Sequence, residues 1–165
     1  GIVPRNEMQR IGGVGMAARA SGLMRDIRSS HPWGKYATTT KHESITQHDG
    51  DVMSRLMERC DEVQQSAQRI KALLECYTPS AEYSHPDYEC KLKPAHLSFG
   101  LIEGWRGEIC HVALTNDKGQ ISTYKVKEPS LHNWLALALA VRGEGISDFP
   151  ICNKSFNLSY CGHDL

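Results

Sequence analysis

The sequence predicts a mainly α domain of the α+β class, with one long helix, one β-hairpin and one buried apolar helix. Three patterns indicate this: apolar residues spaced three and four apart over 51–77, alternating apolar residues over 107–126, and a nearly continuous apolar run over 131–142. A chain of 165 residues is long enough to bury its own core. We therefore expect residues 1–165 to form a single domain.

The first predicted helix is short and begins near Pro4. Glycines follow at positions 12, 13, 15 and 22, and each costs a helix about 1 kcal/mol relative to alanine. We expect a tight passage there and a turn at His31-Pro32. The stretch GGVG lacks the lysine and the serine or threonine of a phosphate-binding loop, so we interpret it as a point of close backbone packing.

The long helix is predicted over 51–77. Its apolar positions form one stripe, which we expect to be buried: Val52, Leu56, Cys60, Val63, Ala67, Ile70 and Leu74. Asp49 or Gly50 is expected to cap its start, and Thr78-Pro79 to end it. A coiled coil would show similar spacing, but the flanking positions do not sustain it, so a bundle helix is favoured.

The second half of the chain combines strands and helices. Residues 78–98 are rich in proline and show no period, which predicts a loop or an extended excursion. From Gly107 onward, apolar residues alternate on both sides of the sequence Asn-Asp-Lys-Gly at 116–119, which predicts a hairpin. Pro129-Ser130 would then start a helix over 131–142 that is closed by Gly143 and buried on most sides. A short helix followed by irregular chain completes the prediction.

Charge and hydropathy exclude several classes of partner. The 19 basic and 19 acidic side chains balance, so no net field attracts nucleic acid or an anionic membrane surface. The longest strongly apolar run, 134–141, falls far short of the roughly 20 residues that a membrane span requires. No export signal is visible at the start. We therefore expect a cytoplasmic setting and no nucleic-acid partner.

The six cysteines and eight histidines show none of the short spacings typical of metal sites. Cys-x-x-Cys, His-x-x-x-His and His-Glu-x-x-His are all absent from the sequence. Cys161 and His163 could contact one metal only with ligands from elsewhere, so no metal site is predicted. Cysteines so placed in a reducing compartment are expected to be buried apolar residues or surface thiols.

Two other chemical interpretations stay open at this point. A Cys-His or Ser-His-Asp nucleophilic site needs partners that are neighbours in space rather than in sequence, although no Gly-x-Ser-x-Gly elbow supports it. Arg106 follows Trp105 at the entrance to the hairpin. Its guanidinium is either held by aromatic packing or paired at the surface with Glu103 or Glu108.

Longer motifs spread over the chain carry a family resemblance. The pattern R-x-S-G-x-x-x-D-x-R-x-x-x-P-[YW] is matched by Arg19, Ser21, Gly22, Asp26, Arg28, Pro32 and Trp33. The pattern G-D-x-x-S-R-x-x-x-R-x-x-E-[VM]-x-x-S is matched by Gly50, Asp51, Ser54, Arg55, Arg59, Glu62, Val63 and Ser66. The pattern E-x-P-R-G-E, followed by a hairpin and Y-K-[VI]-[KR]-x-P-[ST], is matched by Glu103, Arg106, Gly107, Glu108, Tyr124, Lys125, Val126, Lys127, Pro129 and Ser130. Together with the ending SFNLSYCGHDL, these stretches resemble the C-terminal part of the family that comprises nickel–iron hydrogenase large subunits and the 49 kDa-type NADH dehydrogenase subunit of respiratory complex I. The resemblance implies a helical bundle of the hydrogenase large-subunit type.

The ending departs from the hydrogenase pattern where the metal ligands stand. In hydrogenases of this family, a stretch resembling S-F-D-P-C-x-x-C-x-x-[HR] supplies two of the cysteines that bind the nickel–iron centre. Here Asn157 stands at the aspartate, Ser159 at the first cysteine and Gly162 at the second, while Cys161 is one residue out of register. A hydroxyl and a glycine cannot supply thiolate donors. The resemblance therefore implies no nickel–iron centre and no cofactor bound by this chain.

The resemblance implies part of a membrane-associated, energy-converting oxidoreductase complex of NADH:quinone oxidoreductase or hydrogenase type. The chain would be the C-terminal portion of its large subunit, inactive alone and peripheral on the inner face of the cell membrane. It would dock on membrane subunits and on an iron–sulfur subunit that carries the cluster. A cavity inherited from the active site would bind a quinone or couple conformational change to ion pumping. The candidates to line it are Arg19, Asp26, Arg28, Glu103, Arg106, Ser130, Ser159 and His163.

No catalytic residue is assigned, and the roles of three candidates are weighed by physical argument. Asp26, Arg28 and Glu103 are interpreted as buried ion-pair partners in preference to proton carriers, holding the long helix against the hairpin. Two other functions remain as alternatives. A non-catalytic scaffold domain would lack a quinone-sized pocket beside Arg106 and the C-terminal tail, and a fragment of a true hydrogenase would acquire nickel.

Overall fold

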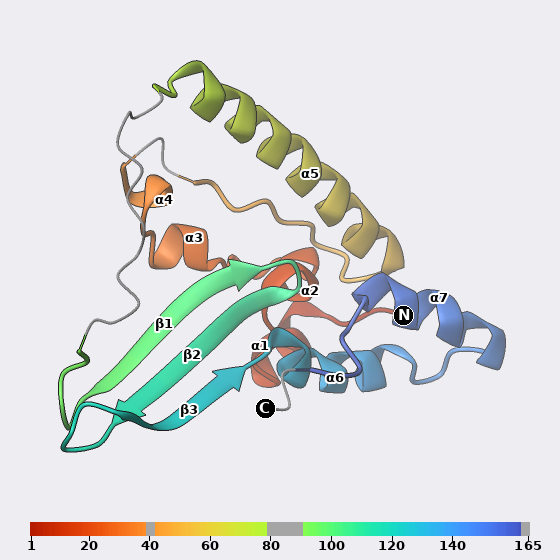
Figure 1. Cartoon of the computed structure of the whole chain (residues 1–165). Coiled ribbons are helices and arrows are strands. Elements are labelled where there is room, and N and C mark those ends of the chain that lie inside the picture. Colours follow the sequence, from red (N-terminus) through yellow and green to blue (C-terminus); the bar gives the residue numbers. More distant parts are fainter. Residues whose placement is uncertain (39–41, 79–90, 163–165) are drawn as a thin grey trace.

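The computed structural model describes residues 1–38, 42–78 and 91–162, which form an antiparallel sheet bordered by helices (Figure 1). The strands are β1 (Leu97–Gly104), β2 (Gly107–Thr115) and β3 (Ile121–Lys127), in the order β1-β2-β3. The helices are α1 (Arg5–Arg10), α2 (Gly15–Ala20), α3 (Ile27–Ser30), α4 (Lys35–Thr38), α5 (Val52–Glu75), α6 (Pro129–Ala140) and α7 (Phe149–Phe156). The predicted α+β class is confirmed, but the helices do not form a simple bundle, because a three-stranded antiparallel sheet packs beside them.

The short helix α2 lies at the centre of the packing. Its residues are all buried, and it contacts α1, α5 and β2. The apolar core gathers around it from α1, α2, α6 and α7, and consists of Val3, Met8, Ala17, Ala18, Leu23, Ala136, Leu137, Ala140, Cys152, Phe156 and Leu158. The small side chains of Ala17 and Ala18 let the surrounding elements approach closely. The segment that contains α1 and α2 therefore organises the fold, although each of these helices has only six residues.

The glycine-rich stretch packs closely against the backbone of a neighbouring segment, as the sequence predicts. Gly15 has φ of +62°, and a Cβ there would lie 2.2 Å from the Arg106 carbonyl oxygen and from Gly107 Cα. A Cβ on Gly13 would lie 2.1 Å from Met8 Sδ. The prediction of close packing is confirmed, and it joins the start of α2 to the turn between β1 and β2.

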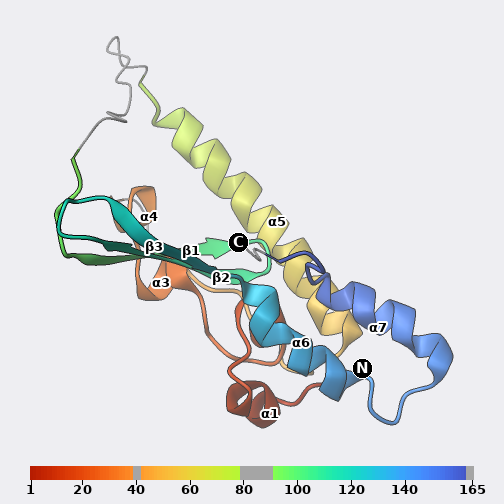
Figure 2. The same ribbon diagram turned by 60° about the horizontal axis from the view of Figure 1, so that its bottom comes forward.

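The long helix is confirmed as α5, but the face that it buries is opposite to the predicted one. The face toward the protein interior carries the buried residues Ser54, Arg55 and Glu58. The apolar stripe is largely uncovered, since Leu56, Val63, Ile70 and Leu74 are 50–67% exposed. The prediction of a buried apolar stripe is wrong because ion pairs, described below, draw the charged face inward. The C-terminal half of the helix also extends away from α6 and α7 (Figure 2).

The start of α5 differs from the prediction by one or two residues. Asp51 is the N-cap, and its side chain accepts a hydrogen bond of 2.7 Å from the Ser54 amide. The helix ends at Glu75, before Thr78. Pro79 lies outside the described residues, as does most of the loop predicted over 78–98.

The sheet contains one strand more than the predicted hairpin. The hairpin itself is confirmed as β2 and β3, which pair from Cys110 with Lys127 to Thr115 with Ile121. β1 begins at Leu97, inside the predicted loop, and pairs with β2 as far as Gly104 opposite Gly107. Its alternation is short and interrupted by Gly100, which explains why the sequence pattern did not reveal it.

The two C-terminal helices follow the prediction with small shifts. α6 begins at Pro129 with Glu128 as its N-cap, earlier than expected. It is buried on one face only, because Leu131 and Leu135 are more than half exposed. α7 is the predicted short helix, and it contacts both α5 and α6. Within the described ranges, no helix combines the length and apolarity needed to cross a membrane.

We predict that Gly15→Ala lowers the free energy of unfolding by more than about 1 kcal/mol, because a Cβ is opposed by both the positive φ and the backbone of Arg106 and Gly107. Urea unfolding of the purified variant measures this loss.

Gly143→Ala is the matched control, since Gly143 also has positive φ, +76°, but a Cβ at this position would have no heavy atom within 4 Å. It should cost less than Gly15→Ala. Equal losses would show that the close approach contributes nothing beyond backbone strain.

Candidate functional site

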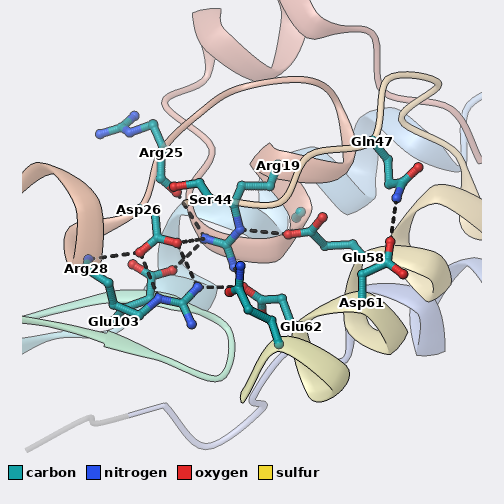
Figure 3. A network of polar contacts seen from close by, with 12 residues as sticks. Arg19, Arg25, Asp26, Arg28, Ser44, Gln47, Glu58, Asp61, Glu62 and Glu103 are labelled. Atoms are coloured by element: carbon teal, nitrogen blue, oxygen red, sulfur yellow. Dashed lines mark hydrogen bonds and ion pairs between the residues drawn. The ribbon is translucent and has the colours of Figure 1, made fainter. Parts of the chain in front are cut away.

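Arg19 is the centre of a buried group of charges between α2, α5 and β1. Its side chain is 1% exposed, and its guanidinium donates hydrogen bonds in three directions (Figure 3). Nε lies 2.7 Å from Glu58 Oε1, and Nη2 lies 2.8 Å from Glu62 Oε1, both on α5. Nη1 lies 2.8 Å from Glu103 Oε1 on β1. One guanidinium therefore binds three carboxylates from two elements.

Asp26 and Arg28 continue these contacts at the start of α3. Asp26 is the N-cap and accepts a hydrogen bond of 2.9 Å from the Arg28 amide. The Arg28 guanidinium returns to Asp26, with Nη2 2.7 Å from Oδ2, and also contacts Glu62. His42 Nε2 lies 3.0 Å from the same Asp26 oxygen. We call the seven residues the Arg19 cluster: Arg19, Asp26, Arg28, His42, Glu58, Glu62 and Glu103.

The members of the Arg19 cluster differ in how their environment affects ionisation. Burial opposes the charge of Asp26, but hydrogen bonds from His42 and Arg28 outweigh it and hold the pKa of that carboxyl well below its usual value. Burial raises the pKa of Glu58 to about 7 against the opposing hydrogen bond from Arg19. Burial likewise raises the pKa of Glu103, again opposed by Arg19. The carboxylates around Arg19 are therefore not equivalent.

The ion pairs agree with the interpretation of Asp26, Arg28 and Glu103 as buried ion-pair partners. Glu58 and His42 were not among the residues singled out from the sequence, and Glu62 had no predicted site role. The sequence does contain a pattern that could have indicated Glu58 and Glu62. Charged residues recur on one face of the predicted helix at three- and four-residue spacing: Arg55, Glu58, Arg59 and Glu62. Such a face is usually solvated, and its burial here depends on partners distant in sequence: Arg19 for Glu58 and Glu62, and Ser155 for Arg55 and Arg59.

A cavity of about 400 Å³ adjoins the Arg19 cluster. Arg28 and Glu103 line one side of it, and its other lining residues are Ile27, Trp33, Gly34, Lys35, Tyr36 and Ile102. Its volume falls in the range of small-molecule sites, and it combines aromatic faces with a few charged groups, as such sites commonly do. It is the cavity closest to the sequence-predicted candidates on α3 and β1.

Arg106 lies apart from this cavity, at the turn between β1 and β2. Its Nε donates a hydrogen bond to the carbonyl oxygen of Asn157, the left-handed residue that ends α7. This contact replaces the pairings with Glu103 or Glu108 that the sequence left open. Trp105 and Asn157 line a second cavity, of about 430 Å³, between α5 and α7.

Ser130 and Ser159 form a third group, where the tail meets the start of α6. The Ser159 amide donates to Ser130 Oγ at 3.0 Å, and Ser130 Oγ donates to Glu128 Oε1 at 2.6 Å. Ser159 also lines a small cavity of about 140 Å³ with Trp134 and Tyr160. His163 lies outside the described residues. The candidates thus fall into three groups beside different cavities.

The tail offers poor chemistry for a nickel–iron centre. Ser159 Oγ accepts a hydrogen bond of 3.1 Å from the Gly162 amide, so the two residues at the ligand positions contact each other through a hydroxyl and a backbone group. Neither can supply a thiolate, and the nearby Cys161 is exposed. The residues present do not fit that centre. Over 1–38, 42–78 and 91–162, no three His, Cys, Asp or Glu side chains gather in a way that could hold a metal ion.

Comparison with known proteins relates the chain to respiratory enzymes. The family model described as respiratory-chain NADH dehydrogenase, 49 Kd subunit, matches residues 1–99. The chain is 28% identical over 155 residues to hydrogenase-4 component G of Escherichia coli (strain K12), covering 94% of this chain and 27% of that protein. It is also 28% identical over 174 aligned residues to NADH-quinone oxidoreductase subunit 4 of Thermus thermophilus, covering 90% of this chain and 42% of that protein.

A solved structure shares the fold. A chain of the membrane-bound sulfane sulfur reductase, an archaeal respiratory membrane complex, superposes with a TM-score of 0.85 at 22% identity, covering 96% of this chain and 44% of that one. At this identity the likeness concerns the fold alone. The chain spans between about a quarter and less than half of the length of these relatives.

We predict that Arg19→Gln lowers the free energy of unfolding by about 3–5 kcal/mol, because it leaves buried carboxylates on α5 and β1 without their charged partner. Chemical denaturation at neutral pH measures the loss.

Arg10→Gln is the control, because Arg10 pairs with Glu7 on the surface of α1 and its side chain is 67% exposed. Its loss should be far smaller than that of Arg19→Gln, because solvent and salt screen an exposed ion pair. A loss of similar size in both variants would contradict a structural role for the buried pairs.

Proposed function

This chain belongs to the family of the 49 Kd subunit of respiratory-chain NADH dehydrogenase, and we propose that it forms part of the large subunit of a membrane-associated, energy-converting oxidoreductase complex without a nickel–iron centre. The relatives support this, since their names describe subunits of NADH-quinone oxidoreductases and of hydrogenases. The complex, not this chain alone, would transfer electrons.

One observation carries the proposal that nickel has been lost. The tail that would supply two metal ligands instead forms a hydrogen-bonded connection from Gly162 through Ser159 to Ser130. Oxygen and amide groups of this kind are poor donors for a centre that depends on thiolates. In this proposal the chain keeps the fold of the family but lacks the thiolates with which its hydrogenase members bind nickel and iron.

A quinone-type ligand is the substrate class that the 400 Å³ cavity suits best. The exposed ring of Trp33 can stack on a flat conjugated ring, and the Arg28 guanidinium can donate to a ring carbonyl. Ile27 and Ile102 add apolar surface that can contact the apolar substituents of the ligand. The proposed quinone cavity lies beside α3, α4 and β1. The sequence predicts a cavity that Arg106 and the C-terminal tail would also line, but Arg106 and the described part of the tail do not line this one.

The proposed partners are an iron–sulfur subunit, which would carry the cluster, and membrane subunits that hold the chain at the inner face of the cell membrane. The exposed apolar side chains of α5 support a place in a larger assembly. Leu56, Val63, Ile70 and Leu74 recur along one face of the helix. Continuous apolar surface of this kind commonly marks contacts with other polypeptides.

Metal analysis tests the loss of nickel. We expect the full-length subunit, purified after expression with hydrogenase maturation machinery, to contain nickel far below one atom per chain. A hydrogenase large subunit that retains both cysteine pairs is the positive control. Stoichiometric nickel would overturn the proposal and favour a true hydrogenase.

We predict that Trp33→Ala raises the KM of the intact complex for a water-soluble quinone about three- to tenfold, because it removes one stacking face from the cavity. Steady-state assays with varied quinone concentration measure the change.

Trp105→Ala is the matched control, since Trp105 is similarly exposed but lines the cavity between α5 and α7. Its quinone KM should stay unchanged. If only Trp105→Ala raised KM, the quinone would belong to the other cavity, and unchanged KM in both variants would exclude both cavities.

A further inference from the structure

The Arg19 cluster contains more acid than base. Its four carboxylates, on Asp26, Glu58, Glu62 and Glu103, contact the two guanidinium groups of Arg19 and Arg28. The remaining basic group is the imidazole of His42, which lies on Asp26. With every carboxyl ionised and the imidazole neutral, the buried cluster would carry two uncompensated negative charges. Such an excess is costly in a low-dielectric interior.

Glu58 has the weakest set of hydrogen-bond partners among these carboxylates. Asp26 binds Arg28 through both oxygens, and Glu103 accepts from Arg19 at Oε1 and from the Ile27 amide at Oε2. Glu62 accepts from both guanidinium groups. Glu58 accepts through Oε1 from Arg19 Nε, while its buried Oε2 has no hydrogen-bond partner among the described residues. The side chain is fully buried, so solvent does not compensate for this.

The charged groups around Glu58 do not supply a second cation. On α5, Asp61 and Glu62 add negative charge nearby, and Asp61 is occupied by Gln47. Two other α5 cations are directed toward α7, because Arg55 Nε donates to Ser155 Oγ and Arg59 donates to the Ser155 carbonyl oxygen.

The elements packed against α5 supply the remaining charges. From α2 Glu58 faces Arg19, which it shares with Glu103 on β1. Asp26 and Arg28 on α3, together with His42, pair with one another and with Glu62. On α7, Lys154 contacts Asn157, and Arg106 donates to the Asn157 carbonyl oxygen.

We propose that Glu58 binds an exchangeable proton, which makes the Arg19 cluster a buried proton-binding site between α2 and α5. The reaction is the addition of a solvent proton to the Glu58 carboxylate, giving a neutral carboxyl group that still accepts from Arg19 Nε through its carbonyl oxygen. The charge excess falls by one, and no other group needs to change. The rise of the Glu58 pKa to about 7 through burial agrees with this geometry. The family motif matched at the start of α5 leaves this position unspecified.

The Arg19 cluster also has a connection to solvent. The side chains of Glu62 and Arg28 are 13% and 15% exposed, and Arg28 and Glu103 line the 400 Å³ cavity. A solvent proton can therefore reach the edge of the cluster at Glu62, whereas Glu58 itself stays buried. The site does not require a ligand in the cavity, so it stands independently of the proposed quinone.

Protonation of Glu58 links stability to pH. The folded-state pKa lies above the unfolded value of about 4.3, so the folded protein binds more protons between these two values. The stabilising contribution is fully present below about pH 4.3 and is lost as pH rises to about 7. Deprotonation leaves three carboxylates on one guanidinium, and the folded protein then bears the desolvation cost of a further buried negative charge.

Infrared difference spectroscopy of the purified protein tests the proposal directly. Between pH 5 and pH 9 we expect the carbonyl stretch of a protonated carboxylic acid to disappear with a midpoint near pH 7, and Glu58→Gln to abolish this step. Glu62→Gln is the matched control, since Glu62 lies one turn along α5 and also binds Arg19. It should retain the step with a lower midpoint, because a neighbouring negative charge has been removed.

Three results would overturn the proposal. One is the absence of any such band in the wild-type protein, which does not depend on whether a variant folds. Another is a step that persists in Glu58→Gln. The third is a titration near neutral pH that gives an imidazole signal and is abolished by His42→Asn, which would place the proton on His42.

Discussion

The buried guanidinium of Arg19 joins α2 to α5 and β1 through hydrogen bonds to Glu58, Glu62 and Glu103. A guanidinium suits this position because its donors diverge in one plane and it stays charged in the interior. The carboxylates in turn make burial of Arg19 tolerable, since a buried charge without a partner costs several kcal/mol. The orientation of α5 and the position of the sheet both depend on this mutual compensation.

The same constraint explains the unusual surface of α5. A helix with apolar residues at three- and four-residue spacing normally turns that face inward. Here the small core made by α2, α6 and α7 is already filled by residues such as Ala17, Leu137 and Phe156. The Arg19 cluster holds the opposite face of α5 against α2, and Leu56, Val63 and Ile70 remain exposed. Buried charges, not apolar residues, therefore decide which face of the helix is turned inward.

Much of the fold could be predicted from the sequence where the determinants are local. The length of α5, the hairpin of β2 and β3 and the close approach at Gly15 follow from periodicity, turn residues and glycine. The strand β1 could not be recognised, because its pattern is short and its pairing with β2 is visible only in three dimensions.

The candidate site was predictable only in part, for a related reason. The family motifs pointed to Arg19, Asp26 and Glu103, which the fold brings together. They gave no indication of Glu58 or of His42, whose roles depend on partners 39 and 16 residues away in sequence. Ser130 and Ser159 also meet, but beside a different cavity from the cluster. Motifs therefore identified residues that matter for the fold without showing which of them share a site.

A double-mutant cycle between Arg19 and Glu103 tests most directly whether the guanidinium holds α2 to the sheet. The measured quantity is the free energy of unfolding of Arg19→Met, Glu103→Gln and the combined variant. We expect the double variant to lose less stability than the sum of the single losses, with a coupling energy above about 1 kcal/mol. Additive losses, within about 0.5 kcal/mol, would contradict the proposed role of Arg19.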